Sequence, residues 1–248
     1  MLRAVWKLLW VEAKLYLREP PAFFFTLLFP TLLVLVFGAV FGNKPGMFSP
    51  RFGYIDAEVP AIAAIIIGTV ALMGIPVATA TKREQGILRR YRATPLSPAA
   101  YLAADLGVNL GMALLGMLIL VVTAKLLFGL RFGGSWPSVL TAFILAALAF
   151  FSMGYLVASL APSARVAQTV GSVAYFPMMF LSGAALPRQI MPDNVRHVSD
   201  ALPLTIVVKL LQGLWQGGAW GDHWGEVGIL AGMLVAGTLV SSRAFRWE

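Results

Sequence analysis

The sequence is poor in three things that usually carry chemistry: cysteine, histidine and charge. It has no cysteine, which excludes structural disulfides, thiol catalysis and cysteine-ligated zinc or iron–sulfur sites. Its two histidines, His197 and His223, are too few for a histidine-rich metal site. Charged residues make up only 12% of the chain, against about 25% in a soluble domain. With 59% hydrophobic residues and a mean hydropathy of +0.81, the chain is predicted to be an integral membrane protein.

Long uncharged runs predict six transmembrane helices. The first run, Ala22–Gly42, has 21 residues and would be about 31 Å long as a helix, which is enough to cross a bilayer. The six predicted spans are 22–42, 59–81, 102–128, 137–160, 166–186 and 227–240. No linker divides the chain, so the expected fold class is an all-α integral membrane protein with one transmembrane domain over residues 1–248.

The distribution of basic residues predicts the orientation. The net charge of +8 is explained first by topology and anionic lipid, with membrane lipid as a partner and no nucleic acid. With the N-terminus in the cytoplasm, the inner segments hold twelve Lys and Arg residues and the outer segments hold seven. This bias follows the positive-inside rule, and six spans then leave both termini in the cytoplasm.

The segment before the first span is predicted to be an amphipathic helix in the inner membrane interface, over residues 1–19. Its cations Arg3, Lys7, Lys14 and Arg18 fall within an arc of about 60° on a helical wheel, opposite an apolar side. Such a helix serves either as a membrane tether or as a lever connected to a cytoplasmic partner. Glu19–Pro21 ends it, because proline cannot continue a helix and restricts the preceding residue.

The loop between spans two and three, residues 82–100, is longer than a chain reversal requires. It contains five cations, a predicted short helix Glu84–Tyr91 with apolar Ile87 and Leu88, and a stiff exit at Thr94–Pro98. A positive-inside topology signal explains the cations only. A short helix held outside the membrane by a rigid turn is suited to docking into another protein.

A third segment, residues 187–215, follows span five on the outer side. Pro187, Pro192 and Pro203 break helices there, and Ser182–Gly183 just before it allows a kink. The hydrophobic stretch Ala201–Trp215 is too short for a span. We expect an outer re-entrant helical hairpin before the last span.

These three segments, in this order, resemble the membrane (permease) subunits of type-2 ATP-binding cassette transporters, a largely export-dedicated class. In the inner loop the resemblance rests on Glu84, Gly86, Leu88, Thr94, Pro95, Leu96 and Ser97, with Ile87 and Arg89 departing from the usual Thr and Glu. In the outer segment it rests on Ser182, Gly183, Pro187, Met191, Pro192, Pro203, Leu204 and Thr205. The resemblance covers essentially the whole chain.

The resemblance implies an exporter of an amphipathic or hydrophobic substrate (a drug, lipid or glycan) in a bacterial or archaeal cell membrane. It implies a second permease subunit, most simply in a homodimer, and separate ABC ATPase subunits that hold the ATP and magnesium. The sequence itself has no phosphate-binding glycine loop with its lysine. We therefore expect a transport subunit that is not an enzyme, with no catalytic residue, cofactor or metal of its own.

Particular residues are predicted to carry this function. The ATPase-coupling set is Glu84, Gly86, Ile87, Leu88, Arg89, Arg90, Thr94, Pro95, Leu96 and Ser97. Glu84 would orient the start of the short helix or pair with a cation, Ile87 and Leu88 would enter an apolar notch of the ATPase, and the arginines would meet acidic residues around it. A substrate path is predicted at Asn109, Phe176, Met179 and Ser182. Whether Asp105 and Lys125 also line the path is open.

Two other classes of function compete with this one. An ion-coupled carrier or channel generally has carboxylates in mid-span, and none is evident. A polytopic membrane enzyme needs converging acid, base or nucleophilic groups at one depth, and the predicted spans contain no histidine and no paired carboxylates.

Overall fold

The computed structural model describes residues 2–46, 51–88, 98–186 and 191–244. In this part of the chain every regular element is helical and there is no strand, which confirms the predicted all-α class. The elements are α1 (Leu2–Leu17), α2 (Pro20–Phe23), η1 (Phe24–Leu28), α3 (Phe29–Phe41), α4 (Tyr54–Gly68), η2 (Thr69–Gly74), α5 (Ile75–Glu84), α7 (Pro98–Phe128), α8 (Trp136–Leu160), α9 (Ala164–Leu181), α10 (Asp193–Asp200), α11 (Pro203–Trp215), η4 (Trp220–His223) and α12 (Trp224–Ala244).

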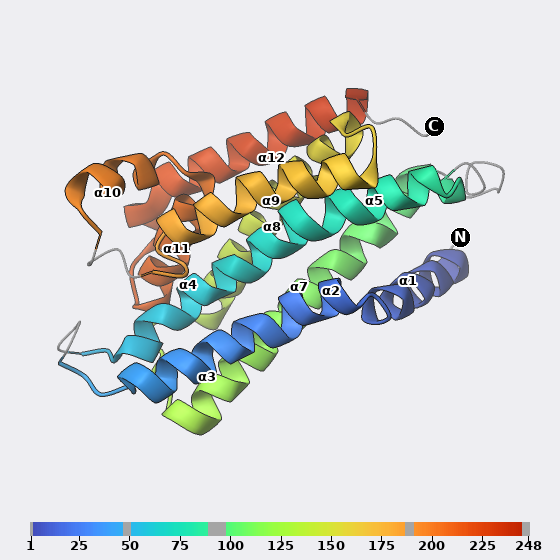
Figure 1. The fold of residues 1–248 in the computed structure, drawn as a ribbon. Coiled ribbons are helices and arrows are strands. Elements are labelled where there is room, and N and C mark those ends of the chain that lie inside the picture. Colours follow the sequence, from blue (N-terminus) through green and yellow to red (C-terminus); the bar gives the residue numbers. More distant parts are fainter. Residues whose placement is uncertain (1, 47–50, 89–97, 187–190, 245–248) are drawn as a thin grey trace.

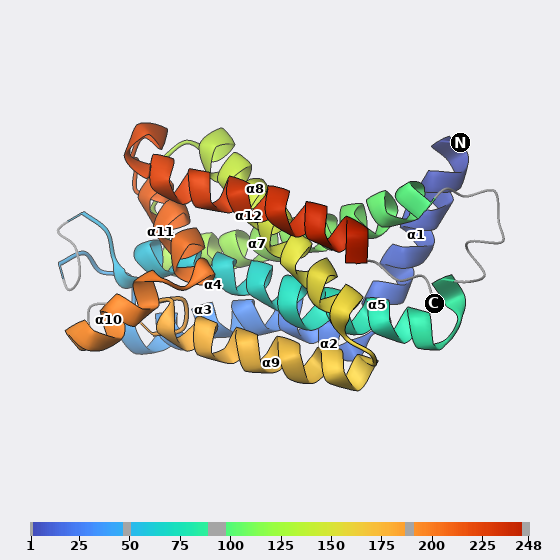
Figure 2. The same ribbon diagram turned by 90° about the horizontal axis from the view of Figure 1, so that it is seen from above.

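The long helices lie side by side in one bundle (Figures 1 and 2). Five continuous helical segments are long and apolar enough to cross a membrane: Pro20–Phe41, Tyr54–Glu84, Tyr101–Phe128, Trp136–Leu160 and Trp220–Arg243. The pair α10 and α11, bent by 93°, passes the same test when taken together. Helix α1, the end of α5, the start of α7 and the end of α12 lie at one end of the bundle, which we call the terminal end (Figure 1).

The second span differs from the expected 59–81, because it begins at Tyr54 and ends at Glu84. Two carboxylates, Asp56 and Glu58, interrupt the apolar run in the sequence, but both are buried inside the protein. A carboxylate enclosed by protein can lie within a membrane helix, so the run of uncharged residues underestimates the length of the span.

Helix α9, which corresponds to the expected fifth span, lies along the bundle beside α5 and α8 (Figure 1). It is not among the five strongly apolar segments, and it contains Arg165, Gln168, Thr169 and Ser172. Gln168 and Thr169 are exposed. A polar exposed side is unfavourable against hydrocarbon, which indicates that this side of α9 faces protein or water.

Two π-helical segments interrupt the first two spans, at Phe24–Leu28 and Thr69–Gly74, each just before a proline. A π-helical turn leaves backbone carbonyls free of the regular ladder. At η2 these carbonyls face glycines: a Cβ on Gly154 of α8 would overlap the carbonyl oxygen of Ala71, and a Cβ on Gly171 of α9 that of Leu72. The glycines therefore allow the second span to pack closely between α8 and α9.

Helix α1 lies across the terminal end of the bundle, inclined to α3 (Figures 1 and 2). It ends at Leu17, and a new helix begins at Pro20, with Glu19 in an extended conformation between them. This break agrees with the effect predicted for Glu19–Pro21. At the opposite end, α11 buries most of its side chains against α4, α8 and α12. The later part of the segment predicted to be re-entrant therefore belongs to the protein core, whereas α10, in its earlier part, buries only Ser199.

Candidate coupling site at the end of helix α5

Three consecutive side chains in the last turn of α5, those of Lys82, Arg83 and Glu84, connect this helix to four others. The ammonium of Lys82 lies 2.7 Å from Glu12 Oε2 of α1 and 3.0 Å from Asp105 Oδ1 of α7. Only 16% of the Lys82 side chain and 5% of the Glu12 side chain are exposed, so water screens these ion pairs little. Lys82 therefore ties α1 and α7 to the end of the second span.

Asp105 extends this contact to α8. Its Oδ2 accepts a hydrogen bond of 2.6 Å from the Tyr155 hydroxyl, and the Asn109 amide donates to the Asp105 carbonyl oxygen at 2.8 Å. We call Glu12, Lys82, Asp105, Asn109 and Tyr155 the polar cluster. A cavity of about 50 Å³ lies beside it, between α1, α5 and α7, and Glu12 Oε1 is buried without a hydrogen-bond partner among the described residues.

Arg83 and Glu84 face the turn between α8 and α9. The Arg83 guanidinium donates to the carbonyls of Ala158, at 3.1 Å, and Ala161, which belong to the C-terminal end of α8. Glu84 Oε1 accepts from the backbone N–H of Ala164, at 2.9 Å, at the start of α9. A cation at a helix C-terminus and a carboxylate at an N-terminus both match the helix dipoles. Glu84 therefore orients the start of α9 rather than the start of a helix of its own.

The predicted short helix over 84–91 is interrupted near its start. Glu84 is the last residue of α5, and Gly86 has a φ of +68°, the left-handed conformation that commonly ends a helix. Ile87 and Leu88 are helical again. Leu88 is fully buried within the chain and Ile87 is half-buried, so in this conformation Ile87 is the more accessible of the two. The predicted coupling residues Arg89, Arg90, Thr94, Pro95, Leu96 and Ser97 lie outside the described residues.

Glu12 is a residue of this site that the sequence reasoning missed. On the helical wheel it lies on the apolar side of the N-terminal helix, away from the cationic arc. A carboxylate on an apolar face must find a buried partner. Glu12 was therefore a detectable signal for a contact between α1 and the spans, but the sequence does not name Lys82 as the partner.

The rest of α1 shows two kinds of contact. Lys14 and Arg18 are exposed, and the Lys14 ammonium lies 5.0 Å from the centre of the exposed Trp10 ring. The side chains of the other two cations, Arg3 and Lys7, lie outside the described residues. Tyr16 faces inward, where its hydroxyl lies 2.7 Å from Thr26 Oγ1, and burial raises the Tyr16 pKa to about 12.

The four residues predicted to line a substrate path lie in different surroundings. Asn109 belongs to the polar cluster. Met179 and Ser182 are buried, whereas Phe176 is exposed on α9. Lys125, whose role was left open, donates to the Leu130 carbonyl at 3.1 Å near the opposite end of the bundle.

At that opposite end, Asp56 forms a second polar group, which we call the backbone lock. Asp56 Oδ2 accepts from the Gly53 N–H at 2.8 Å, and Oδ1 accepts from the Arg131 N–H at 2.7 Å and from the Asn43 amide at 2.8 Å. The Asn43 amide also donates to the Phe128 carbonyl at 3.1 Å. Asp56 is completely buried, and it joins the loops after α3 and α7 to the start of α4.

These features define a multi-pass helical membrane protein whose terminal end is joined through one connected set of polar contacts. The family model of the ABC-2 type transporter matches residues 3–214, and the chain belongs to this family of transporter membrane subunits. It is therefore a permease subunit of an ABC transporter.

Individual relatives agree with this assignment. The chain is 30% identical to nodulation protein J of Sinorhizobium fredii over 71% of this chain and 65% of that protein. It is 26% identical to the inner membrane transport permease YhhJ of Escherichia coli over 62% of this chain and 42% of that protein. It is 24% identical to the daunorubicin resistance ABC transporter permease protein DrrB1 of Streptomyces coeruleorubidus, over 96% of this chain and 84% of that protein. The chain thus spans less than two thirds of the first two of these proteins.

Proposed function

We propose that this chain is the membrane subunit of an ATP-driven exporter of amphipathic or hydrophobic substrates, coupled to a separate ABC ATPase at the terminal end of the bundle. Family membership supports the transporter class, and the daunorubicin resistance permease among the relatives supports export. In this proposal the terminal end faces the cytoplasm, where the basic residues of the inner segments predict it to be. ATP and magnesium are bound by the ATPase.

The contacts of residues 82–84 are the observation that carries the coupling role. A displacement of the segment after α5 is passed to α1 and α7 through Lys82, to the end of α8 through Arg83 and to the start of α9 through Glu84. One movement of the ATPase would thereby reach α5 and the four helices that α5 contacts through these side chains. Ion pairs and hydrogen bonds between packed helices are among the physical connections that carry energetic coupling between two sites.

A variant pair on the accessible part of the segment tests this role. Ile87→Asp places a charge on a half-buried apolar side chain, and Gln85→Asp places the same charge on an exposed polar one. If Ile87 contacts the ATPase, Ile87→Asp should cost several kcal/mol of association, while Gln85→Asp should leave it nearly unchanged. The measurements are co-purification of the ATPase and ATP hydrolysis by the complex in vesicles. Wild-type association of both variants, at equal expression, would remove the coupling role from this segment.

We further propose a homodimer in which α9 and α3 face the second copy. Exposed apolar side chains recur every three or four residues on both helices. On α9 they are Val166, Val170, Val173, Phe176 and Phe180, and on the first span they are Phe24, Leu28, Leu32, Val36 and Val40. The exposed Thr169, which lies within the same stripe of α9, favours a protein or water neighbour over lipid for this face. A twofold dimer brings identical residues near its axis together.

The absence of cysteine makes the dimer easy to test. Val173→Cys on α9 introduces a single thiol at the proposed interface, and Val235→Cys does the same on the exposed side of α12. A disulfide requires Cα atoms within about 7 Å of each other, so oxidation in membranes should give a covalent dimer with Val173→Cys and none with Val235→Cys. The reverse pattern would place α12, not α9, at the dimer interface.

A further inference from the structure

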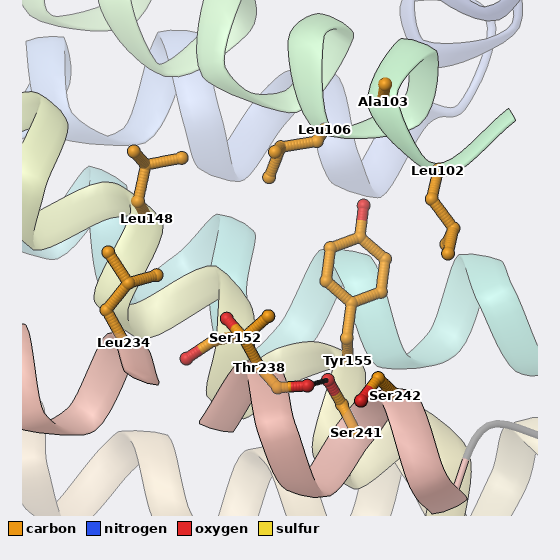
Figure 3. A pocket seen from close by; sticks show the side chains of 10 residues that line it. All are labelled: Leu102, Ala103, Leu106, Leu148, Ser152, Tyr155, Leu234, Thr238, Ser241 and Ser242. Carbon is orange, nitrogen blue, oxygen red and sulfur yellow. Dashed lines mark hydrogen bonds between the residues drawn. The ribbon is translucent and has the colours of Figure 1, made fainter. Parts of the chain in front are cut away.

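A crevice of about 230 Å³ lies between α7, α8 and α12, and Tyr155 is among the residues that line it (Figure 3). Its mouth is formed by side chains that are exposed, among them Ala103 of α7 and Thr238 and Ser242 of α12. Helix α12 is the least enclosed of the five membrane-length segments, with 11% of its apolar window buried in the protein. In a membrane this crevice therefore opens to lipid.

The polarity of the crevice changes along α12. Leu234, facing Leu148 of α8, forms an apolar part, and Thr238, Ser241 and Ser242 follow toward the terminal end (Figure 3). The Ser241 and Ser242 hydroxyls donate to helix carbonyls at 3.2 Å and 2.9 Å. A serine hydroxyl can rotate and exchange such a bond for an acceptor on a ligand.

A cation follows the hydroxyl groups. Arg243, the next residue, is exposed and pairs with no acidic side chain among the described residues. An arginine at the end of a membrane helix is suited to the headgroup layer, where it attracts anionic lipid. From Leu234 to Ser242 the lining passes from apolar to hydroxyl groups, which is the complement of acyl chain and ester. Arg243 follows Ser242 outside this lining and marks the level of the lipid headgroups.

We propose that this crevice is a binding site for one membrane phospholipid, with an acyl chain between Leu148 and Leu234, ester oxygens at Ser241 and Ser242, and its headgroup in the layer at the level of Arg243. The volume is below the range of about 300–1,000 Å³ that is typical of small-molecule sites, which favours a single chain over a bulky ring system. This lipid is bound at the lipid-facing surface of α7, α8 and α12. It is distinct from the transported substrate, which the proposed dimer would carry at the opposite face.

The position of Tyr155 gives this lipid a connection to the coupling site. The Tyr155 ring lines the crevice and its hydroxyl donates to Asp105 of the polar cluster. A chain that fills the crevice restricts the Tyr155 side chain and so stabilises one arrangement of the cluster.

Photolabelling tests the proposed site. The full chain is reconstituted in vesicles of phosphatidylethanolamine and phosphatidylglycerol that contain a trace of phosphatidylglycerol with a diazirine at the end of one acyl chain. We expect adducts concentrated on peptides that contain Leu148 or Leu234. Ala103→Phe fills the crevice from α7 and should reduce this labelling about tenfold, which corresponds to losing contact with about two methylene groups. Ala236→Phe, which adds the same ring at an exposed position of α12 outside the crevice, should leave it unchanged.

A second filling variant and a headgroup variant complete the test. Thr238→Phe fills the crevice from α12 and should reproduce the effect of Ala103→Phe, so a folding defect in one variant does not decide the result. Arg243→Gln should reduce the preference for phosphatidylglycerol over phosphatidylcholine probes about fivefold, as expected for one cation near the headgroups. Equal labelling of exposed residues all around the bundle, unaffected by Ala103→Phe or Thr238→Phe, would overturn the site. Adducts or cross-links between two copies of the chain at this face would assign it to a protein partner instead.

Discussion

The two ends of the bundle both bury an aspartate, but they hold it in different ways. In the backbone lock, Asp56 accepts from two backbone N–H groups and one amide, and it closes the loops around the start of α4. In the polar cluster, Asp105 is held by the side chains of Lys82, Tyr155 and Asn109, which belong to three helices. Two backbone N–H groups hold the first aspartate together with the Asn43 amide and the Arg131 guanidinium at 3.8 Å, whereas the second is held by side chains.

This difference indicates which end can move. Backbone N–H groups in a loop cannot change partner without a change in the loop, so the backbone lock keeps its end fixed. Side-chain pairs can exchange partners by rotamer changes, and the polar cluster also contains a carboxylate oxygen of Glu12 without a partner and a small cavity. The terminal end is therefore the end at which helices can shift relative to one another.

The largest effect on stability is expected at the end of the bundle that contains the backbone lock. Asp56→Asn turns one of the two acceptor oxygens into a donor, which faces either the Gly53 N–H or the Arg131 N–H. Leaving one of these N–H groups without an acceptor, together with the loss of the charge, should lower the free energy of unfolding by about 3 kcal/mol. Thermal unfolding in detergent measures the change, and Asp193→Asn, at a side chain that is 85% exposed, is the control. Equal stability of the two variants would show that the backbone lock is not needed for the fold.

At the terminal end we expect a smaller loss of stability but a larger loss of coupling. Lys82→Met leaves Glu12 and Asp105 buried without their cation and should cost about 2–3 kcal/mol, somewhat less than for a fully buried pair. Transport in vesicles should fall much more than ATP hydrolysis, because α1 and α7 are no longer tied to α5. Lys125→Met removes an exposed lysine whose partner is one carbonyl and should change neither activity. A parallel loss of transport and hydrolysis would favour a purely structural role for Lys82.

A loss of stability of intermediate size is expected when the backbone conformation just after the end of α5 is disturbed, and no such loss is expected at an ordinary helix position. Gly86→Ala forces a side chain into the left-handed region and should cost about 1 kcal/mol. A Cβ at this position would touch nothing within 4 Å, so the cost comes from the backbone alone. Gly111→Ala, on α7, has equally open surroundings but lies in a helix and should be neutral or slightly stabilising. Thermal unfolding of the two variants gives the comparison, and equal effects would contradict a required break at Gly86.

The smallest effect is expected for the contact between Glu84 and α9. Glu84→Ala removes the acceptor of the Ala164 N–H, and loss of a helix cap at an exposed position costs about 1 kcal/mol or less. Glu84→Gln keeps the acceptor and loses only the charge, so it should cost a few tenths of a kcal/mol at low salt and nothing at high salt. Unfolding measured at two salt concentrations distinguishes the two variants. A salt-independent loss in Glu84→Gln would indicate that geometry, not charge, is what matters there.

The sequence predicted the helices better than it predicted their contacts. The all-α class, most of the spans and the break at Glu19–Pro21 follow from hydropathy and proline, which act within a short stretch of chain. The span from Tyr54 was predicted to begin at Val59, because a buried carboxylate and an exposed one look the same in a sequence. Glu84 was predicted to orient the start of its own helix or to pair with a cation, since the sequence does not show that the start of α9 lies next to it.

By itself, then, the sequence determined that this protein is a helical membrane protein, where its chain reverses and which segment between the second and third spans carries an excess of positive charge. These properties depend on how each stretch of residues is distributed between water and hydrocarbon, and that is a local property of the side chains. Only the tertiary structure decided that Lys82 pairs with Glu12 and Asp105, 70 and 23 residues away along the chain. It also decided that Leu88 faces inward and that hydroxyl groups of α8 and α12 line one crevice. Contacts of this kind depend on the relative positions of helices that are far apart in the chain. The charges alone allow several ion pairs, and the packing of the helices determines which of them forms.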